Sequence, residues 1–183
     1  MSNTHLPPLN SLNPATLECL KVYQQHSDQD IEKKMAKLVL AQKAWSATKF
    51  TQRKVCMLRL GIELEKIKQQ AANTMALEMG KPWVQGVREL SKCAWLCRCL
   101  AESAETYVGS EIIPTEYKRS YVQFEPIGNV LAIMPWNFPF WQVFRCAIPA
   151  IMAGHGVVLK HAPSTQGCAE MIEQIFFEAG FPE

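Results

Sequence analysis

The segment from Pro126 to Lys160 constrains the fold of this chain more than any other. It contains two apolar runs, at 130–134 and 157–159, and the first run stops at the sequence Pro-Trp-Asn-Phe-Pro. An amphipathic stretch long enough for a helix separates the two runs. Short apolar runs that alternate with helices are typical of parallel strands joined by right-handed crossovers. The segment therefore predicts a strand–helix–strand unit, and such units bind ligands beyond the carboxyl ends of their strands.

The part of the chain that follows residue 128 is expected to be entirely of this type. The predicted elements are a strand at 129–134, a helix at 140–153, a strand at 157–160 and a helix at 166–179. Two parallel strands alone would leave long unpaired edges, which natural proteins avoid. We therefore expect an α/β fold whose sheet is incomplete within these 183 residues, as in a truncated piece of a longer protein.

The first hundred residues favour helices. Ser27 is a good N-cap for a helix that begins near Asp28, and apolar residues follow at helical spacing. A second helix is predicted over 52–79, with Gly80 as its left-handed stop. A third helix is predicted over 82–107, because Pro82 suits a first turn.

Two segments outside these helices are expected to be extended. Residues 1–18 are rich in Pro, Asn and Ser and predict an extended or partly ordered arm. Residues 118–125 alternate apolar and polar side chains, so we expect 111–125 to form an exposed, two-stranded antiparallel arm. Three parts follow: an N-terminal arm and helical part at 1–107, a β-arm at 108–126 and a strand–helix part at 127–183.

Composition excludes several classes of function. The net charge of +2 gives no reason to expect nucleic acid or an anionic membrane as a partner. No run of eighteen apolar residues is present, so no membrane span is predicted. The N-terminus lacks a basic region followed by an apolar stretch, so it is no secretory signal, and we expect a cytoplasmic protein.

The seven cysteines are expected to be free thiols of a reducing compartment. Cys93, Cys97 and Cys99 cluster on one predicted helix, but no histidine lies nearby, so we expect core thiols rather than a metal site. Cys146 and Cys168 have no candidate base beside them in the sequence, and neither is nominated as a nucleophile.

Asn137 lies in the middle of the Pro-Trp-Asn-Phe-Pro sequence. Pro135 and Pro139 restrict the backbone on both sides of it. The Asn137 amide, held at the end of a strand, could donate a hydrogen bond to an oxyanion. Asn is also a strong N-cap residue, and on general grounds a cap for the following helix is the more frequent role.

Arg145 follows Asn137 by eight residues, just over two helical turns, and could face the same side as the helix start. Its neighbours Val143, Phe144 and Ala147 are apolar. An arginine in such surroundings favours a carboxylate or phosphate ligand. The alternative, a salt bridge at the surface or between helices, is the more frequent role for an arginine by composition alone.

Lys160 ends the second predicted strand, where dinucleotide-binding sheets often carry an acidic residue. A lysine there could donate to ribose hydroxyls or pair with a 2′-phosphate. The G-x-G-x-x-G fingerprint is absent, and the glycines at 154 and 156 precede a strand, which indicates a plain turn. His155 and His161 have no partner in the sequence and receive no chemical role from it.

These motifs together resemble the aldehyde dehydrogenase superfamily. The resemblance rests on Ile-Met-Pro-Trp-Asn-Phe-Pro, on the Arg eight residues after its Asn, and on Val-Val-Leu-Lys-His-Ala-Pro-Ser. It extends from about Ile31 to the end, and Glu-Met-Gly-Lys-Pro at 78–82 fits as well. Within the superfamily the chain looks most similar to bacterial NAD(P)-dependent succinate-semialdehyde dehydrogenases. The implied fold is a set of N-terminal helices, a β-arm and the first strands and helices of a Rossmann-like domain.

The resemblance implies roles for individual residues. Asn137 matches the residue whose amide stabilises the thiohemiacetal oxyanion, and Arg145 matches the position that holds the distal carboxylate of the substrate. Residues 108–126 match the strands that join subunits into a homodimer or homotetramer. The implied NAD or NADP site comprises Ile133, Met134, Pro135, Trp136, Asn137, Lys160, His161, Ala162 and Pro163.

Two departures from the family pattern matter. Many NAD-preferring relatives carry a Glu where this chain has Pro163, so the resemblance leaves NADP open and we expect both cofactors to be accepted. The nucleophilic Cys and the general-base Glu of the family fall beyond residue 183, so we expect this chain alone to be inactive. The alternative is a non-catalytic module for nucleotide binding or assembly.

Overall fold

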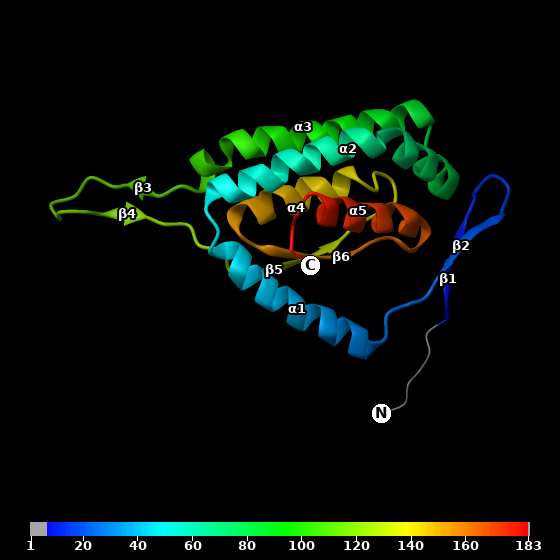
Figure 1. Cartoon of the computed structure of the whole chain (residues 1–183), viewed down its shortest axis with the longest axis horizontal. Coiled ribbons are helices and arrows are strands. Elements are labelled where there is room, and N and C mark those ends of the chain that lie inside the picture. The colour runs from blue at the N-terminus through cyan, green and yellow to red at the C-terminus, as the bar shows by residue number, and fades with distance from the viewer. Residues whose placement is uncertain (1–6, 183) are drawn as a thin grey trace.

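The computed structural model describes residues 7–182, which form a helical layer packed on a small α/β unit (Figure 1). The elements in chain order are β1 (Leu9–Leu12), β2 (Cys19–Tyr23), α1 (Asp28–Ser46), α2 (Phe50–Met79), α3 (Trp83–Val108), β3 (Glu111–Ile112), β4 (Tyr121–Val122), β5 (Asn129–Ile133), α4 (Trp141–Ala153), β6 (Gly156–Lys160), the 3-10 turn η1 (Pro163–Thr165) and α5 (Gln166–Glu178). The three N-terminal helices and the strand–helix order after residue 128 are as predicted.

The long helices begin and end where the sequence indicates. Ser27 caps α1 through a reciprocal pair of hydrogen bonds with Asp30. Gly80 ends α2 with a φ of 72°, a left-handed conformation that glycine adopts without strain. α2 and α3 then run side by side as an antiparallel pair (Figure 1). Gly86 permits their close approach, because a Cβ there would lie 3.0 Å from Ala72.

The expectation of an extended or partly ordered N-terminal arm was incomplete. Residues 1–6 lie outside the described residues, but β1 and β2 pair as an antiparallel hairpin. The turn between the strands holds Leu17 at a φ of 62°, an uncommon conformation for a leucine. Ser11 of β1 is buried and donates to Glu78 of α2, which ties the hairpin to the body.

β5 and β6 pair in parallel, with α4 as the crossover helix. Their register aligns Asn129 with Gly156 and Ile133 with Lys160, so the two carboxyl ends meet at one edge. Among residues 7–182 this sheet has two strands, as expected for an incomplete α/β fold. The main core lies between the α2–α3 pair and helices α4 and α5, and its largest fully buried side chains include Met57, Leu60, Leu64, Phe144 and Ile148.

The β3–β4 arm projects away from the body (Figure 1). The strands pair antiparallel, although each is only two residues long, which is shorter than the run of 118–125 predicted. The side chains of Ile112 and Tyr117 on this arm are 80% and 74% exposed. The arm therefore offers apolar side chains that are largely exposed.

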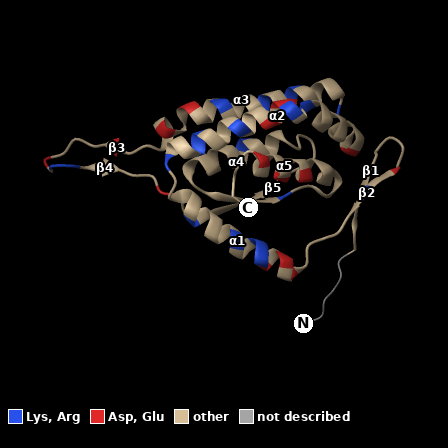
Figure 2. Cartoon of the chain, in the orientation of Figure 1, with Lys and Arg blue, Asp and Glu red and all other residues tan. Residues whose placement is uncertain are grey.

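Charge and hydropathy of the helices fit a water-facing outer surface. Basic and acidic residues are intermixed along α2 and α3 (Figure 2). Within residues 7–182 the structure has no helix of the length and apolar character that a membrane crossing requires.

Arg53 of α2 joins the C-terminal ends of two other helices. Its guanidinium is buried and donates to the carbonyls of Trp45, Ser46 and Thr48 at the end of α1, and to Met152 at the end of α4. Burial lowers the pKa of Arg53. A cation at helix C-terminal carbonyls interacts favourably with both helix dipoles and satisfies groups that have no intrahelical partner.

We expect Arg53→Met to lower the free energy of unfolding by about 3 kcal/mol, because several buried carbonyls lose a charged donor. Urea unfolding monitored by tryptophan fluorescence measures the change. Lys54→Met, on the exposed face of the same helix, is the matched control and should change stability little. Equal losses of unfolding free energy in Arg53→Met and Lys54→Met would contradict the stabilising role assigned to Arg53.

Candidate functional site

The loop between β5 and α4 carries the predicted site residue Asn137. Asn137 is exposed, and α4 begins only at Trp141, with Phe140 as N-cap and no hydrogen bond from a side chain of the cap residue. The interpretation of Asn137 as the helix cap is therefore wrong. Its side chain stays available for another partner, while its main-chain carbonyl accepts a hydrogen bond of 3.0 Å from Lys81 Nζ.

Glu89 of α3 caps α4 instead. Its Oε1 accepts from the backbone N–H groups of Phe140 at 2.9 Å and Trp141 at 2.8 Å. Its other oxygen, Oε2, accepts from Lys81, and both side chains of this ion pair are almost fully buried. Lys81 Nζ also lies 3.8 Å from the centre of the Phe138 ring. Sequence reasoning had noted Glu-Met-Gly-Lys-Pro as a family feature but had given Lys81 and Glu89 no role.

Arg145 is exposed on α4, one turn after Trp141. Within residues 7–182 it has no ion-pair partner, so the salt-bridge alternative is not observed. The two-turn spacing from Asn137 does not hold, because the first three residues after Asn137 precede the helix or form its cap. Trp141 and Arg145 are four residues apart on α4 and share one face.

A pocket of about 220 Å³ opens beside this loop. Its lining residues are Gln85, Arg88, Glu89 and Lys92 of α3 with Phe138 and Trp141. Lys92 Nζ lies 3.8 Å from the centre of a ring of Trp141. Cationic and aromatic groups thus gather next to Asn137, a surface suited to a small anionic molecule.

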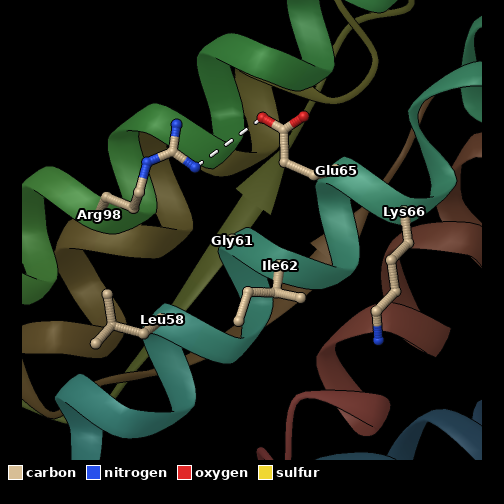
Figure 3. Close-up of a pocket in the computed structure, with 6 residues that line it drawn as sticks. All are labelled: Leu58, Gly61, Ile62, Glu65, Lys66 and Arg98. Carbon is tan, nitrogen blue, oxygen red and sulfur yellow. Dashed lines mark ion pairs between the residues drawn. The ribbon is translucent and has the colours of Figure 1, made fainter.

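A larger groove of about 600 Å³ lies between the outer faces of α2 and α3 (Figure 3). It is lined by Leu58, Gly61, Ile62, Glu65, Lys66 and Arg98, and Arg98 approaches Glu65 at 4.0 Å across it. No predicted site residue lines it. We therefore place the candidate site at the smaller pocket and the carboxyl ends of β5 and β6.

Ile133 and Lys160 face each other at the carboxyl ends of β5 and β6. The two segments stay together beyond the strands, because the Met134 N–H donates to the Lys160 carbonyl at 3.0 Å. Trp136 and the Lys160 side chain are exposed, whereas Met134 is half-buried. This edge combines exposed apolar groups with an accessible cation, which fits the ribose end of a dinucleotide.

His161 and Ala162 are buried just behind this edge, and Pro163 is exposed. His161 Nε2 donates to the Pro139 carbonyl at 2.8 Å, while Nδ1 accepts from the Ala162 N–H and the Thr165 hydroxyl. These bonds require the neutral ring. Burial lowers the pKa of His161. His161, for which the sequence indicated no partner, therefore links the loops that follow β5 and β6.

Glu78 of α2 caps α5 much as Glu89 caps α4. Its carboxylate accepts from the N–H groups of Gly167 at 2.8 Å and Cys168 at 3.1 Å. Helix N-termini ordinarily attract phosphate, but both helices that follow a strand of the parallel sheet already hold a carboxylate. The residues present therefore fit the adenosine end of NAD or NADP at Lys160, and they offer no place for the pyrophosphate at α4 or α5.

Four of the seven cysteines have raised pKa values, which disfavour the thiolate form. All seven are free. Burial raises the pKa of Cys56 and Cys93 and raises that of Cys97 to about 12. Burial, with the nearby Glu78 carboxylate, also raises the pKa of Cys168. Over residues 7–182, no group of three His, Cys, Asp or Glu side chains is placed to hold a metal ion.

Fold and site together define an α/β protein with a polar loop at the carboxyl ends of parallel strands. The chain matches the aldehyde dehydrogenase family over residues 2–183 and belongs to that family. The predicted resemblance and the predicted fold class are both confirmed.

Three relatives illustrate the match. The "Probable succinate-semialdehyde dehydrogenase" (NADP(+)) of Synechocystis sp. is 42% identical over 94% of this chain and 38% of its own length. The succinate semialdehyde dehydrogenase (NAD(P)+) of Escherichia coli is 39% identical over 94% of this chain and 37% of its own. The structure of succinic semialdehyde dehydrogenase from Streptococcus pyogenes with NADP+ superposes with a TM-score of 0.89 at 27% identity, over 94% of this chain and 38% of its own. The chain thus spans less than two fifths of the length of these relatives.

We expect the free energy of unfolding to fall below pH 6.5 through His161. The unfolded ring takes up a proton near pH 6.5, whereas the buried ring resists protonation, so its contribution is complete above that pH and is lost as the pH falls through the lower folded pKa. Urea unfolding at pH 7.5 and 5.5 measures the difference.

His161→Gln should remove most of this pH dependence. His155→Gln is the control, because His155 is half-buried with a ring nitrogen, Nδ1, bonded to the Gly128 carbonyl and should leave the dependence intact. An unchanged pH dependence in His161→Gln would contradict the assignment.

Proposed function

We propose that this chain supplies the oxyanion donor, the substrate carboxylate site and the ribose edge of an NAD(P)-dependent aldehyde dehydrogenase. The complete enzyme would oxidise succinate semialdehyde with water to succinate, and NAD(P)+ would be reduced to NAD(P)H with release of two protons. The observation that carries the proposal is an exposed Arg145 without an ion-pair partner within residues 7–182, one turn into the helix that follows the Asn137 loop. The names of the relatives from Synechocystis sp. and Escherichia coli support the substrate.

Each residue has one task in this proposal. A thiolate outside residues 1–183 attacks the aldehyde carbon, and the exposed Asn137 amide donates to the oxygen that becomes negative. Such a donor contributes about 3 kcal/mol to transition-state stabilisation. Arg145 pairs with the distal carboxylate, and Lys160 donates to the adenosine ribose or its 2′-phosphate. When bound, NAD(P) supplies the hydride acceptor.

Pro163 supports the use of both cofactors. It is exposed just beyond Lys160 and carries no charge that would repel a 2′-phosphate. The main-chain segments at 133–136 and 160–163 would form the adenosine edge. The exposed β3–β4 arm would join copies of the complete enzyme into a homodimer or homotetramer, because an apolar arm on the surface favours burial against a partner.

A complete enzyme is needed to test the roles of these residues. It can be obtained by joining residues 1–183 to the remaining part of the Escherichia coli relative. In this enzyme, Arg145→Ala should reduce kcat/KM for succinate semialdehyde by about 100-fold, because a charged partner of the carboxylate is lost. The same variant should reduce kcat/KM for an uncharged aldehyde by less than about 3-fold.

Arg98→Ala is the matched control, since Arg98 is an exposed arginine on α3 in the distant groove. Similar losses for both aldehydes in Arg145→Ala would remove the basis for the substrate assignment.

We expect the 183-residue chain by itself to oxidise no aldehyde, because raised pKa values keep its buried thiols protonated. Formation of NAD(P)H by a preparation of verified mass would overturn this expectation.

The second candidate, a non-catalytic module for nucleotide binding or assembly, is favoured by the same thiols and by the exposed arm. A thermal melt of the chain with NAD or NADP distinguishes nucleotide binding from assembly. Nucleotide that binds only the folded chain raises the melting temperature, and Lys160→Met should abolish the rise. No rise in the wild-type chain, together with self-association through the arm, would indicate assembly alone.

A further inference from the structure

The ion pair of Lys81 and Glu89 lies directly beneath the Asn137 loop. Each residue is only 5% exposed, and the pair connects the start of α3 to its interior. Removing two charges from water costs free energy that their attraction only partly returns, so apolar side chains of similar size would often be as stable. Stability alone therefore does not explain the pair, because apolar side chains at both positions could stabilise the fold as well.

The partners of the pair are almost all in the loop. Glu89 binds the N–H groups of Phe140 and Trp141, and Lys81 binds the Asn137 carbonyl and lies over the Phe138 ring. Four of the five residues from Asn137 to Trp141 thus contact one or the other charge. The main chain on both sides of the Asn137 side chain is fixed by contacts from a different part of the sequence.

Comparison with Glu78 distinguishes the capping of a helix from the positioning of the Asn137 loop. Glu78 caps α5 with two N–H groups in the same way, and its further hydrogen bond comes from the hydroxyl of Ser11, not from a lysine. A buried carboxylate therefore caps such a helix without a lysine partner. The lysine is the feature that distinguishes the α4 cap, and its second hydrogen bond goes to Asn137.

We infer that Lys81, held by Glu89, is a positioning residue that orients Asn137 toward the reacting aldehyde oxygen. The inference rests on the proposed function of Asn137 as the oxyanion donor. A donor displaced by a fraction of an ångström loses much of its effect, because catalysis depends on preorganised geometry. Lys81 itself contacts no substrate atom in this account.

The test uses the complete enzyme described above, with Lys81→Met, Asn137→Ala and the double variant. Lys81→Met keeps an apolar stem of similar length but lacks the donor. We expect it to lower kcat on the order of 10- to 100-fold, with KM for the aldehyde and Kd for NADP changed by less than about 3-fold. In the Asn137→Ala background the same substitution should have almost no further effect on kcat.

Glu78→Gln is the control for a purely structural loss at a helix cap. It should lower the melting temperature and leave kcat near the wild-type value. An equal kcat factor for Lys81→Met in both backgrounds would overturn the inference, because the two residues would then act independently. A folded but inactive wild-type enzyme would contradict the proposed function instead.

A second measurement tests the positioning without activity. Amide hydrogen exchange of the 183-residue chain should become faster at Phe140 and Trp141 in Lys81→Met and remain unchanged at the α5 cap around Gly167. Unchanged protection at Phe140 and Trp141 would overturn the inference, whatever the outcome of the kinetic test.

Discussion

Buried carboxylates on the helical layer hold the α/β unit in place. Glu78 and Glu89 project from α2 and α3 and bind the first N–H groups of α5 and α4. The first N–H groups of any helix lack intrahelical partners, and the helix dipole makes that end positive. The starts of α4 and α5 are thereby fixed on the helical layer, and the loops that precede these two helices are fixed with them.

The same two contacts bear on the proposed nucleotide site. A phosphate group gains most at a helix start whose N–H groups are free. Both helix starts beside β5 and β6 are occupied by protein oxygens, which repel anions. What remains is the edge where Ile133 meets Lys160, with an accessible ammonium group and exposed apolar surface.

Local signals were sufficient to predict most of the fold. Ser27, Gly80 and the apolar runs at 130–134 and 157–159 marked caps, stops and strands, because these depend on neighbours in the sequence. Asn137 and Lys160 were predicted at strand ends by the same local patterns. The β1–β2 hairpin was missed, since its strands are short and partly polar.

The contacts that complete the site are not local. Glu89 lies 51 residues before Phe140 and Glu78 lies 89 residues before Gly167, so no periodicity connects them. The general preference of Asn for helix caps failed at Asn137 for this reason, because the carboxylate of the distant Glu89 caps α4 instead.

The β3–β4 arm has a further mechanical consequence, because it enters from the end of α3 and leaves into Asn129 of β5. A load on the arm would pass into the body along the chain at those two points, and the five residue pairs between β5 and β6 would carry much of it as shear.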